Sequence, residues 1–514
     1  MFNVESPRSP VTLTGERRPL WTLVVGCLGV ALVVGSMVAF NTALGDIAVA
    51  TSATQTQLNW IVDGYTVVLA CLLLPAGAIG DRHGRRVTML AGLAVFSVAS
   101  AVPAFIDSPS ALIASRMVAG AGAAFVMPAT LAVLSQAYPA ERRSRAIAIW
   151  ASVAGCAGVV GLVGSGILLS FWEWQAICWA LAIAGVLVFL AAWTISPAPA
   201  ADRRAVDWIG ASLVAAAVAM VVVGLLEAPS RGWTHPATLA FLAGGLVSGV
   251  AFVMVESRRR QPLLDPRLFR DAPMAASAVT ITAIFAATFG FFYLGMQYAQ
   301  LIMGFSALGA GLAFAPFMIP LVGLSLLSFR YTPRWGLKRV LISGLVVLSA
   351  GFLCLLMLET DSSYLQLAVP TVVIGAGIGL CTAPATSTIM SSLRDERQGV
   401  ASAINDTTRE LGAAVGIAIA GSVLAERYTA EVTPQLSALP EPLREQVADG
   451  FGKAVHVLDS IGPQAAPILA ASEQAFVSAM HTSALVVSGV AAAAALAIAM
   501  IIPAGSRTER GPIR

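Results

Sequence analysis

Five ionisable side chains lie within long apolar stretches of this 514-residue sequence. They are Asp63, Arg116, Asp406, Arg409 and Glu410. A charge in such surroundings is costly and must be paired, hydrated or neutralised, so it marks a functional position by default. A carboxylate there can take up a proton or bind a cation, whereas a guanidinium stays charged and needs an oxygen acceptor. The chemistry that these residue types allow is therefore proton exchange and cation binding.

The last three of these residues form one group. Asp406 and Glu410 are four positions apart, and Asp406 and Arg409 are three apart, so on a helix all three share one side. An aspartate–arginine pair that neutralises itself would be structural, but the spare carboxylate then remains for a proton or a cationic substrate. We expect Glu410 or Asp406 to function directly.

Asp63 lies just inside one boundary of its own apolar stretch, WIVDGYTVVLACLLLPAG. We expect it to bind a proton or a cation, because a carboxylate is expensive at such a depth. The alternative is an interfacial aspartate that reaches water beside Trp60 and Tyr65.

A different pattern of charge occupies the short loop GAIGDRHGRR, from Gly77 to Arg86, which joins two apolar stretches. A cationic loop between membrane helices fixes which side faces the cytoplasm. That task requires neither an aspartate nor glycines at fixed spacing. The loop therefore predicts a further, more particular role.

The elements that position these residues must be membrane helices. The sequence is 57% hydrophobic and only 11% charged, whereas a soluble domain carries about 25% charged residues. This composition excludes a soluble protein, and the net charge of +3 gives no indication of nucleic-acid binding. The four histidines show no metal-ligand spacing, and no phosphate-binding loop G-x-x-x-x-G-K-[ST] occurs. We expect neither an enzyme nor a cofactor or metal.

Fourteen apolar stretches are long enough to cross a membrane as helices. They span 21–44, 58–79, 87–106, 110–136, 146–169, 174–195, 207–227, 236–256, 273–298, 306–329, 338–358, 364–390, 400–424 and 477–503. All but six of the 31 Lys and Arg residues fall in the two tails and in the loops that follow the even-numbered stretches, counted from the N-terminus. This bias predicts a multi-pass protein of the cell membrane with both termini in the cytoplasm.

An internal repeat appears when GDRHGRRV at 80–87 is compared with TPRWGLKRV at 332–340. Both segments join the second and third helix of a six-helix block, and both place Arg-x-Gly before a basic pair and Val. Repeated halves in a polytopic chain indicate a secondary transporter with its site between the repeats.

The predicted architecture is all-α, with two pseudo-symmetric six-helix bundles and a two-helix insert. We divide the chain into a cytoplasmic tail, a first bundle, an insert with its linkers, a second bundle and a second cytoplasmic tail, at 1–20, 21–195, 196–270, 271–503 and 504–514. The second bundle contains a long outer loop, 425–476, in which we expect a short amphipathic helix over the outer surface.

From about residue 20 to residue 505 the sequence resembles the major facilitator superfamily, in particular its fourteen-helix drug:proton antiporters of the EmrB/QacA type. The family's loop motif G-x-x-x-D-R-x-G-R-R is matched in its correct place by Gly77, Asp81, Arg82, Gly84, Arg85 and Arg86. The resemblance implies that these residues form a conformational latch between helices.

Two further motifs match in part. The stretch SRMVAGAGAAF resembles R-x-x-Q-G-x-G-A-A, with Ala119 in place of the glutamine, and the resemblance ties Arg116 to proton transfer. The family's antiporter motif G-P-x-x-G-G would align at 161–166, but Leu162 and Ser165 depart from it. The motif therefore predicts close helix packing at this place, and it supports antiport only weakly. The glycines concerned are Gly158, Gly161, Gly164 and Gly166.

The first helix departs from the family pattern at one important position. Ser36 stands where the family has an acid, although Asn41 is kept. Coupling would then fall to Asp63 and the carboxylates of the thirteenth helix, or the stoichiometry and substrate charge would differ. As pocket residues we name Asn41, and Phe292 and Met296 of the aromatic ninth helix, since such surfaces can bind flat lipophilic cations.

The leading hypothesis is a monomeric, proton-driven exporter of lipophilic, cationic drugs or related small molecules, working by alternating access. Its partners would be these substrates, protons and membrane lipids. A second hypothesis is export of one endogenous product, such as a lipid, a siderophore or a self-made antibiotic. A third, from another class, is a membrane sensor or scaffold that transports nothing.

Overall fold

The structure is a computed structural model that describes residues 14–106, 108–196, 207–437 and 439–502. Most of the two predicted tails and part of the linker in 196–270 lie outside the described residues. Every regular element in the described ranges is a helix, and fourteen helical stretches there are long and apolar enough to cross a membrane. The predicted all-α class and the count of fourteen are confirmed.

The first six spans form one group. They are α1 (Thr14–Ala39), α3 (Gln55–His83), α4 (Arg85–Ala101), α5 (Pro109–Ala137), α6 (Ala140–Phe171) and α7 (Gln175–Trp193), with a short α2 (Leu44–Thr51) between the first two. The insert consists of α8 (Trp208–Arg231) and α9 (Pro236–Arg258). A short helix, η3 (Pro266–Arg270), then leads into the second half.

The second half repeats the arrangement. Its spans are α10 (Ala272–Gln297), α11 (Ala307–Ala313) with α12 (Met318–Trp335), α13 (Leu337–Cys354), α14 (Tyr364–Ser391), α15 (Gln398–Val432) and α18 (Ala466–Ile501). The helix expected at 306–329 is confirmed as one membrane-crossing stretch, Leu308–Trp335, which a short 3-10 turn, Ala315–Phe317, divides into α11 and α12. Pro316 lies at this break, where it lacks an N–H and disfavours a continuous helix.

The same pairs of helices pack in both halves. In the first, α5 packs on α3 and α4, α1 on α6, and α4 on α7. In the second, α14 packs on α12 and α13, α10 on α15, and α13 on α18. Gly84 and Gly336, the glycines of the two Arg-x-Gly segments, have φ of 100° and 80°, which other residues adopt at a cost. The repeat seen in the sequence is therefore a repeat of the same tight turn.

The insert joins the two halves from the side. Helix α8 packs on both α3 and α15, whereas α9 packs mainly on α8 and η3 and is the least buried span among the described residues. The insert is thus placed to contact both halves at once.

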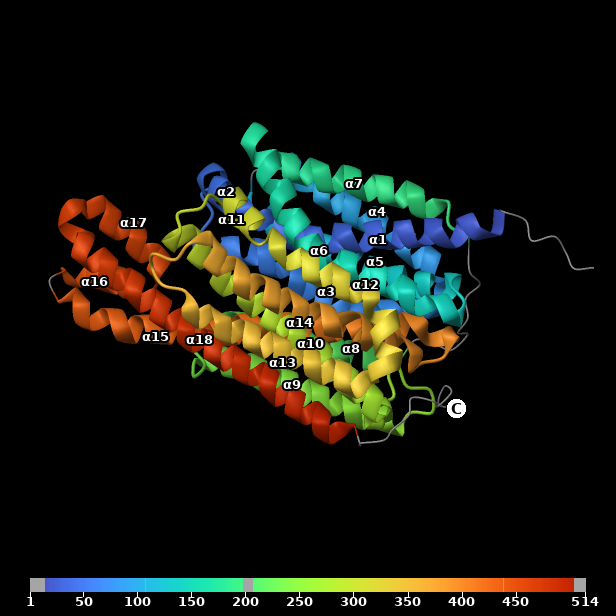
Figure 1. Cartoon of the computed structure of the whole chain (residues 1–514). Coiled ribbons are helices and arrows are strands. Elements are labelled where there is room, and N and C mark those ends of the chain that lie inside the picture. Colours follow the sequence, from blue (N-terminus) through green and yellow to red (C-terminus); the bar gives the residue numbers. More distant parts are fainter. Residues whose placement is uncertain (1–13, 107, 197–206, 438, 503–514) are drawn as a thin grey trace, which may run out of the picture.

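The segment 425–476 is mostly helical, which differs from the expected loop with one short helix. Helix α15 continues to Val432, then α16 (Glu441–Ala448) and α17 (Phe451–Ile461) follow, and α18 begins already at Ala466. Figure 1 shows these elements projecting at one end of the molecule. Helix α17 is amphipathic, as predicted, and turns Phe451, Ala454 and Leu458 inward.

This projection has its own small core. The Tyr428 hydroxyl donates to the carbonyl of Val447 over 3.1 Å, and the rings of Phe451 and Phe476 stack with centroids 5.0 Å apart. All four residues are buried. The opposite end of the molecule, where α3 gives way to α4 next to Asp81, is called the Asp81 end below.

Candidate functional site

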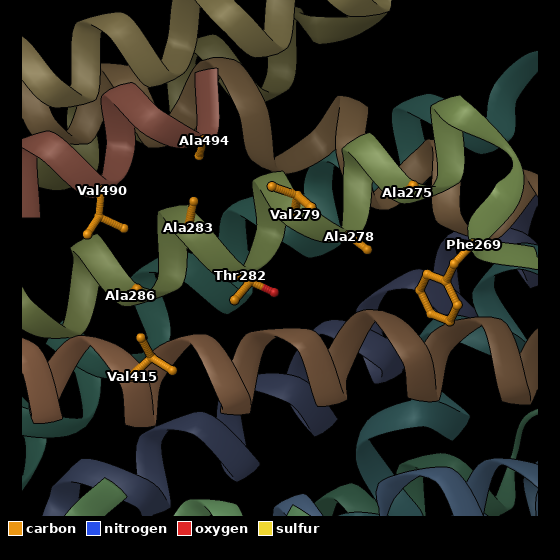
Figure 2. Close-up of a pocket in the computed structure, with 10 residues that line it drawn as sticks. All are labelled: Phe269, Ala275, Ala278, Val279, Thr282, Ala283, Ala286, Val415, Val490 and Ala494. Carbon is orange, nitrogen blue, oxygen red and sulfur yellow. The ribbon is translucent and has the colours of Figure 1, made fainter. Parts of the chain in front are cut away.

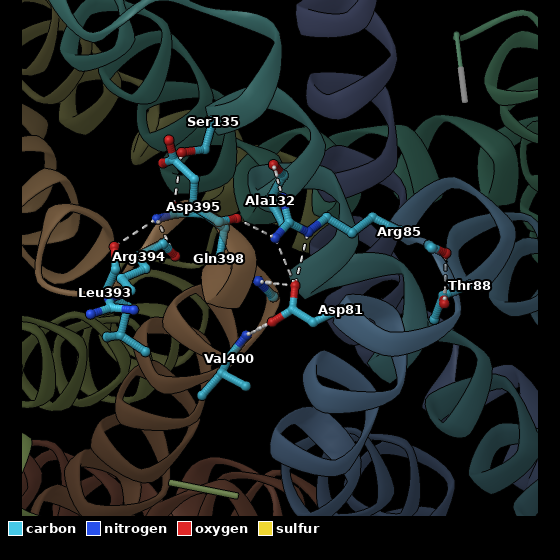
Figure 3. A network of polar contacts seen from close by, with 12 residues as sticks. Asp81, Arg85, Thr88, Ala132, Ser135, Leu393, Arg394, Asp395, Gln398 and Val400 are labelled. Carbon is cyan, nitrogen blue, oxygen red and sulfur yellow. Dashed lines mark hydrogen bonds and ion pairs between the residues drawn. The ribbon is translucent and has the colours of Figure 1, made fainter. Parts of the chain in front are cut away.

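At the Asp81 end, one carboxylate of the first half caps a helix of the second. Asp81 is only 3% exposed, and its two oxygens accept the backbone N–H groups of Gly399 and Val400 over 2.8 and 3.0 Å. These N–H groups belong to the first turn of α15, where a helix has no internal acceptors and attracts negative charge. Asp81 therefore supplies the cap that α15 lacks within its own half (Figure 3).

Arg85 extends this contact. It is buried, donates from Nε to Asp81 Oδ1 over 2.9 Å, and donates from a terminal nitrogen to the carbonyl of Asp395 over 2.8 Å. Arg143 forms an ion pair of 3.0 Å with the side chain of Asp395 at the surface. Three residues of the first half thus hold the start of α15 and the turn before it.

Two glycines allow this approach. A Cβ added to Gly77 would lie 2.5 Å from the carbonyl oxygen of Gly399, and a Cβ added to Gly399 would lie 2.5 Å from that of Gly77. Either side chain would force α3 and α15 apart at the Asp81 end. The two halves are therefore closed on each other here, and Gly77 of the loop motif is needed for the closure.

The other arginines of the motif act elsewhere. Arg82 is exposed. Arg86 donates to the carbonyl of Trp193 and lies over its ring at 5.9 Å, so it fastens the end of α7. Of the latch residues predicted from sequence, Gly77, Asp81 and Arg85 touch the second half directly, whereas Gly84 shapes the turn.

The second cluster is the triad of α15, buried farther along the same helix. Asp406, Arg409 and Glu410 are all at most 5% exposed. Arg409 Nη1 lies 3.7 Å from Asp406 Oδ1, which also accepts from Asn405 over 3.0 Å. Neither Asp406 Oδ2 nor Glu410 Oε2 has a hydrogen-bond partner among the described residues. Buried polar atoms are nearly always bonded, so these two oxygens leave hydrogen-bonding capacity that the described residues do not use.

Aromatic rings from both halves enclose the triad's arginine. The guanidinium of Arg409 lies 4.5 Å from the ring centre of Phe285 on α10 and 5.3 Å from that of Trp150 on α6. Sequence reasoning did not pair these rings with Arg409. Trp150 could not have been found from periodicity, because it comes from the other half of the repeat.

Arg116 occupies a separate site in the first half. It is 2% exposed and donates to Ser36 Oγ over 2.9 Å, to the Ser36 carbonyl over 3.0 Å and to the Ile61 carbonyl over 3.2 Å. The rings of Phe40 and Tyr65 lie 4.6 and 4.2 Å from its guanidinium. Within the described residues no carboxylate pairs with it. Ser36 is thus its direct partner, and cation–π contacts stabilise the charge.

Asp63 belongs to neither cluster. It is half-buried on α3, where α8 packs, and it lies close enough to Glu227 of the insert for the two carboxylates to repel each other. Glu227 forms an ion pair with Arg231, one turn along α8. Sequence reasoning did not single out Glu227, since the packing of the insert cannot be read from hydrophobic patterning.

The remaining pocket candidates do not contact the triad. Phe292 packs on the rings of Phe314 and Phe317 within the second half, and Met296 packs against the same core. Asn41 is exposed near the end opposite Asp81. Phe285 is the aromatic residue of α10 that reaches Arg409.

The glycines of α6 divide into two kinds. A Cβ on Gly161 would lie 2.7 Å from the carbonyl of Gly35, so this glycine brings α6 against α1. Gly166 lies near Leu308 of the second half. Gly158 and Gly164 border open space, with nothing within 4 Å of an added Cβ. The predicted close packing holds at Gly161, and two of the four positions face free volume.

Comparisons with known proteins agree with this architecture. The sequence model described as Major Facilitator Superfamily matches residues 26–417. Multidrug resistance protein Stp of Mycobacterium tuberculosis is 32% identical over 453 residues, which cover 88% of this chain and 83% of that protein. Multidrug efflux pump LfrA of Mycolicibacterium smegmatis is 30% identical over 95% of this chain and 97% of its own. Cephamycin export protein CmcT of Amycolatopsis lactamdurans is 32% identical over 77% and 83%.

Solved structures show the same fold at low identity. The human organic anion transporter MFSD10 (TETRAN) superposes with a TM-score of 0.61 at 15% identity, covering 93% of this chain and 99% of that one. The proton:xylose symporter XylE superposes with a TM-score of 0.59 at 12% identity, covering 95% and 97%. At these identities the likeness concerns the fold alone.

Proposed function

This chain belongs to the major facilitator superfamily, a family of membrane transporters rather than enzymes, and we propose that it exports drug-like small molecules in exchange for protons. The observation that carries the proposal is the triad of α15. It holds a net negative charge in a buried place, it leaves two carboxylate oxygens unpartnered among the described residues, and rings from both halves adjoin it.

The charge of the triad gives a mechanism for exchange. An uncompensated negative charge is costly at this depth, so the site is stable only with a positive partner. A proton on Glu410 or Asp406 neutralises the triad, and so does a cationic substrate between the rings. Because one partner makes the other unnecessary, the two exclude each other. This competition favours lipophilic cations as substrates.

The latch links that site to gating. Helix α15 carries the N–H groups that Asp81 caps at 399–400 and the triad at 406–410, about 15 Å apart along one rigid helix. A shift of α15 that follows a change of charge at the triad would strain the latch. The latch then opens or closes the Asp81 end according to the occupant of the triad.

We also propose an orientation. The basic loops lie at the Asp81 end, so by the positive-inside rule this end faces the cytoplasm and the α16–α17 projection faces outward. In this orientation the structure is closed toward the cytoplasm. Substrate would enter when the latch opens, and proton entry from outside would follow closure.

A second candidate is the export of a single product. CmcT and a tetracenomycin C resistance and export protein of Streptomyces glaucescens carry the names of one antibiotic each, at 32% and 29% identity. The replacement of the family's first-helix acid by Ser36 favours this reading, since it changes the charge that a substrate meets. A panel of unrelated cationic dyes and one antibiotic, tested in inverted vesicles, separates broad export from narrow export.

The experiment that tests proton exchange uses Glu410→Gln and Asp406→Asn in proteoliposomes with an imposed pH gradient. We expect substrate-driven proton flux to be lost in at least one of them. The matched control is Glu426→Gln, an exposed carboxylate at the outer part of the same helix. Full proton flux in both triad variants would disprove the assignment of proton exchange to the triad. A narrow range of substrates in the vesicle assay would change only the proposed substrate class.

A further inference from the structure

An apolar crevice lies between three helices of the second half. Its volume is about 530 Å³, and helices α10, α15 and α18 line it together with η3 (Figure 2). The lining residues are small or apolar and are Phe269, Ala275, Ala278, Val279, Thr282, Ala283, Ala286, Val415, Val490 and Ala494. Thr282 supplies the one side-chain oxygen among them. A polar ligand would therefore find almost no partner here.

The crevice follows one face of α10. Its positions from Ala275 to Ala286 recur every three or four residues, which places them on one side of the helix over about 16 Å. That length matches half of a hydrocarbon core of roughly 30 Å, the distance that the acyl chain of one leaflet spans. The crevice thus has the dimensions of a single lipid tail.

At its far end the insert covers the same face. Two turns beyond Val415 on α15, Ser422 accepts a hydrogen bond of 2.9 Å from the indole of Trp233. Gly421 beside it lies against Pro229 of α8 and Tyr293 of α10. The crevice is the part of this face nearer the Asp81 end, within membrane-spanning helices. At that depth we expect lipid hydrocarbon beside it.

The mouth of the crevice is basic. Phe269, which lines it, is 39% exposed and sits in η3 between Arg267 and Arg270, which are also exposed. Neither arginine forms an ion pair with any residue in the described ranges. Two free cations at the level of the lipid headgroups attract a phosphate.

We propose that the crevice holds one acyl chain of an anionic phospholipid, whose phosphate lies between Arg267 and Arg270. The lipid chain lies in the groove that α10 and α15 form with α18, so it contacts both the helix that carries Phe285 and the helix that carries the triad. These two helices already pack closely, because Gly412 and Gly416 lie against the carbonyls of Thr282 and Ala286, and the lipid adds to that contact. This role does not depend on what the protein transports.

The test is native mass spectrometry of the purified, delipidated full-length protein titrated with dioleoyl phosphatidylglycerol or dioleoyl phosphatidylcholine. We expect one phosphatidylglycerol per chain and weaker retention of phosphatidylcholine. One arginine near an anionic lipid contributes about a fivefold gain in affinity, so Arg267→Gln with Arg270→Gln should weaken binding roughly 25-fold. The control, Arg334→Gln with Arg339→Gln, removes two exposed charges at the same end and should change nothing.

A second pair of variants tests the chain-binding part. Val279→Trp fills the crevice and should also abolish retention, as should the milder Ala283→Leu if the first variant folds poorly. Val247→Trp, on the lipid-facing side of α9, is the control for bulk. Equal binding of both lipids, or full retention in the filled variants, overturns the proposal. So does stoichiometric displacement of phosphatidylglycerol by a cationic dye, which would make the crevice a drug site.

Discussion

Removing the charge of Asp81 should open the Asp81 end. In Asp81→Asn the side chain keeps its size, but its amide offers one oxygen to the two backbone N–H groups of α15, so one bond becomes neutral and the other is lost to an NH2 group that cannot accept. A hydrogen bond to a charged group contributes about 1.5–3 kcal/mol and a neutral one about 0.5–1.5 kcal/mol, so the two changes together cost about 2.5–4.5 kcal/mol. Buried Arg85 also loses its carboxylate. The open population should rise roughly 70- to 2,000-fold.

The assay measures how often a buried site becomes accessible. Ser135 is fully buried at the contact between the halves, where its hydroxyl donates to Gln398 over 2.9 Å. In a background without native cysteines, Ser135→Cys should react with a polar maleimide in proportion to the open population. We expect the rate to rise by the same factor in Asp81→Asn. Arg82→Gln, which changes an exposed arginine of the same motif, is the control and should leave the rate unchanged.

One result would refute this reasoning. If Asp81→Asn reacts at the rate of the parent protein while its thermal unfolding is also unchanged, the carboxylate does not hold the halves together. A rate that rises equally in Arg82→Gln would instead mean that the loss of any charge from the loop, and not the loss of the cap on α15 in particular, allows opening.

Two further predictions concern local structure. Gly84→Ala and Gly336→Ala each place a side chain at positive φ, which should lower the free energy of unfolding by about 1–2 kcal/mol. The control, Gly323→Ala, lies in open space on α12 and should leave it unchanged. Equal unfolding temperatures of all three variants in detergent would show that the turns tolerate a Cβ. In Arg116→Lys the ammonium group cannot reach both oxygens of Ser36 or stack on the rings as the guanidinium does, so this variant should unfold at a lower temperature. An unfolding midpoint equal to that of the parent protein would contradict the described site.

The resemblance of the loop to the family motif was enough to single out Gly77, Asp81 and Gly84 as latch residues. Their separate tasks became visible only in the structure, where Asp81 caps α15, Gly84 has a positive φ and Gly77 permits the close contact between helices. What Asp81 binds could not be read, because its partners are backbone N–H groups more than three hundred residues away. The proximity of Glu227 to Asp63 could not be predicted either, because it depends on how α8 packs on α3. Patterning tells which face of a helix is apolar, but not which helix covers it.

The internal symmetry of the fold explains why α15 takes part in the latch, whereas its counterpart in the first half, α6, does not. The two halves meet through two related sets of contacts, α15 against α3 and α5, and α6 against α12 and α14. In the repeat, Pro333 stands at the position of Asp81, so α12 offers no carboxylate to the start of α6. Helix α6 indeed begins without a side-chain cap.

Only one of the two related contacts therefore carries a charged latch, among the residues that the structure describes. The helix held by that latch is also the helix that bears the triad. The repeated fold supplies two related contacts, and because the second repeat has Pro333 where the first has Asp81, the contact of α15 is the one that includes a carboxylate cap. In the mechanism that we propose, a proton or a cation that binds on α15 would therefore bias opening at the Asp81 end through this cap. Helix α6 has no such carboxylate cap, although Arg143 near its start pairs with Asp395 at the surface.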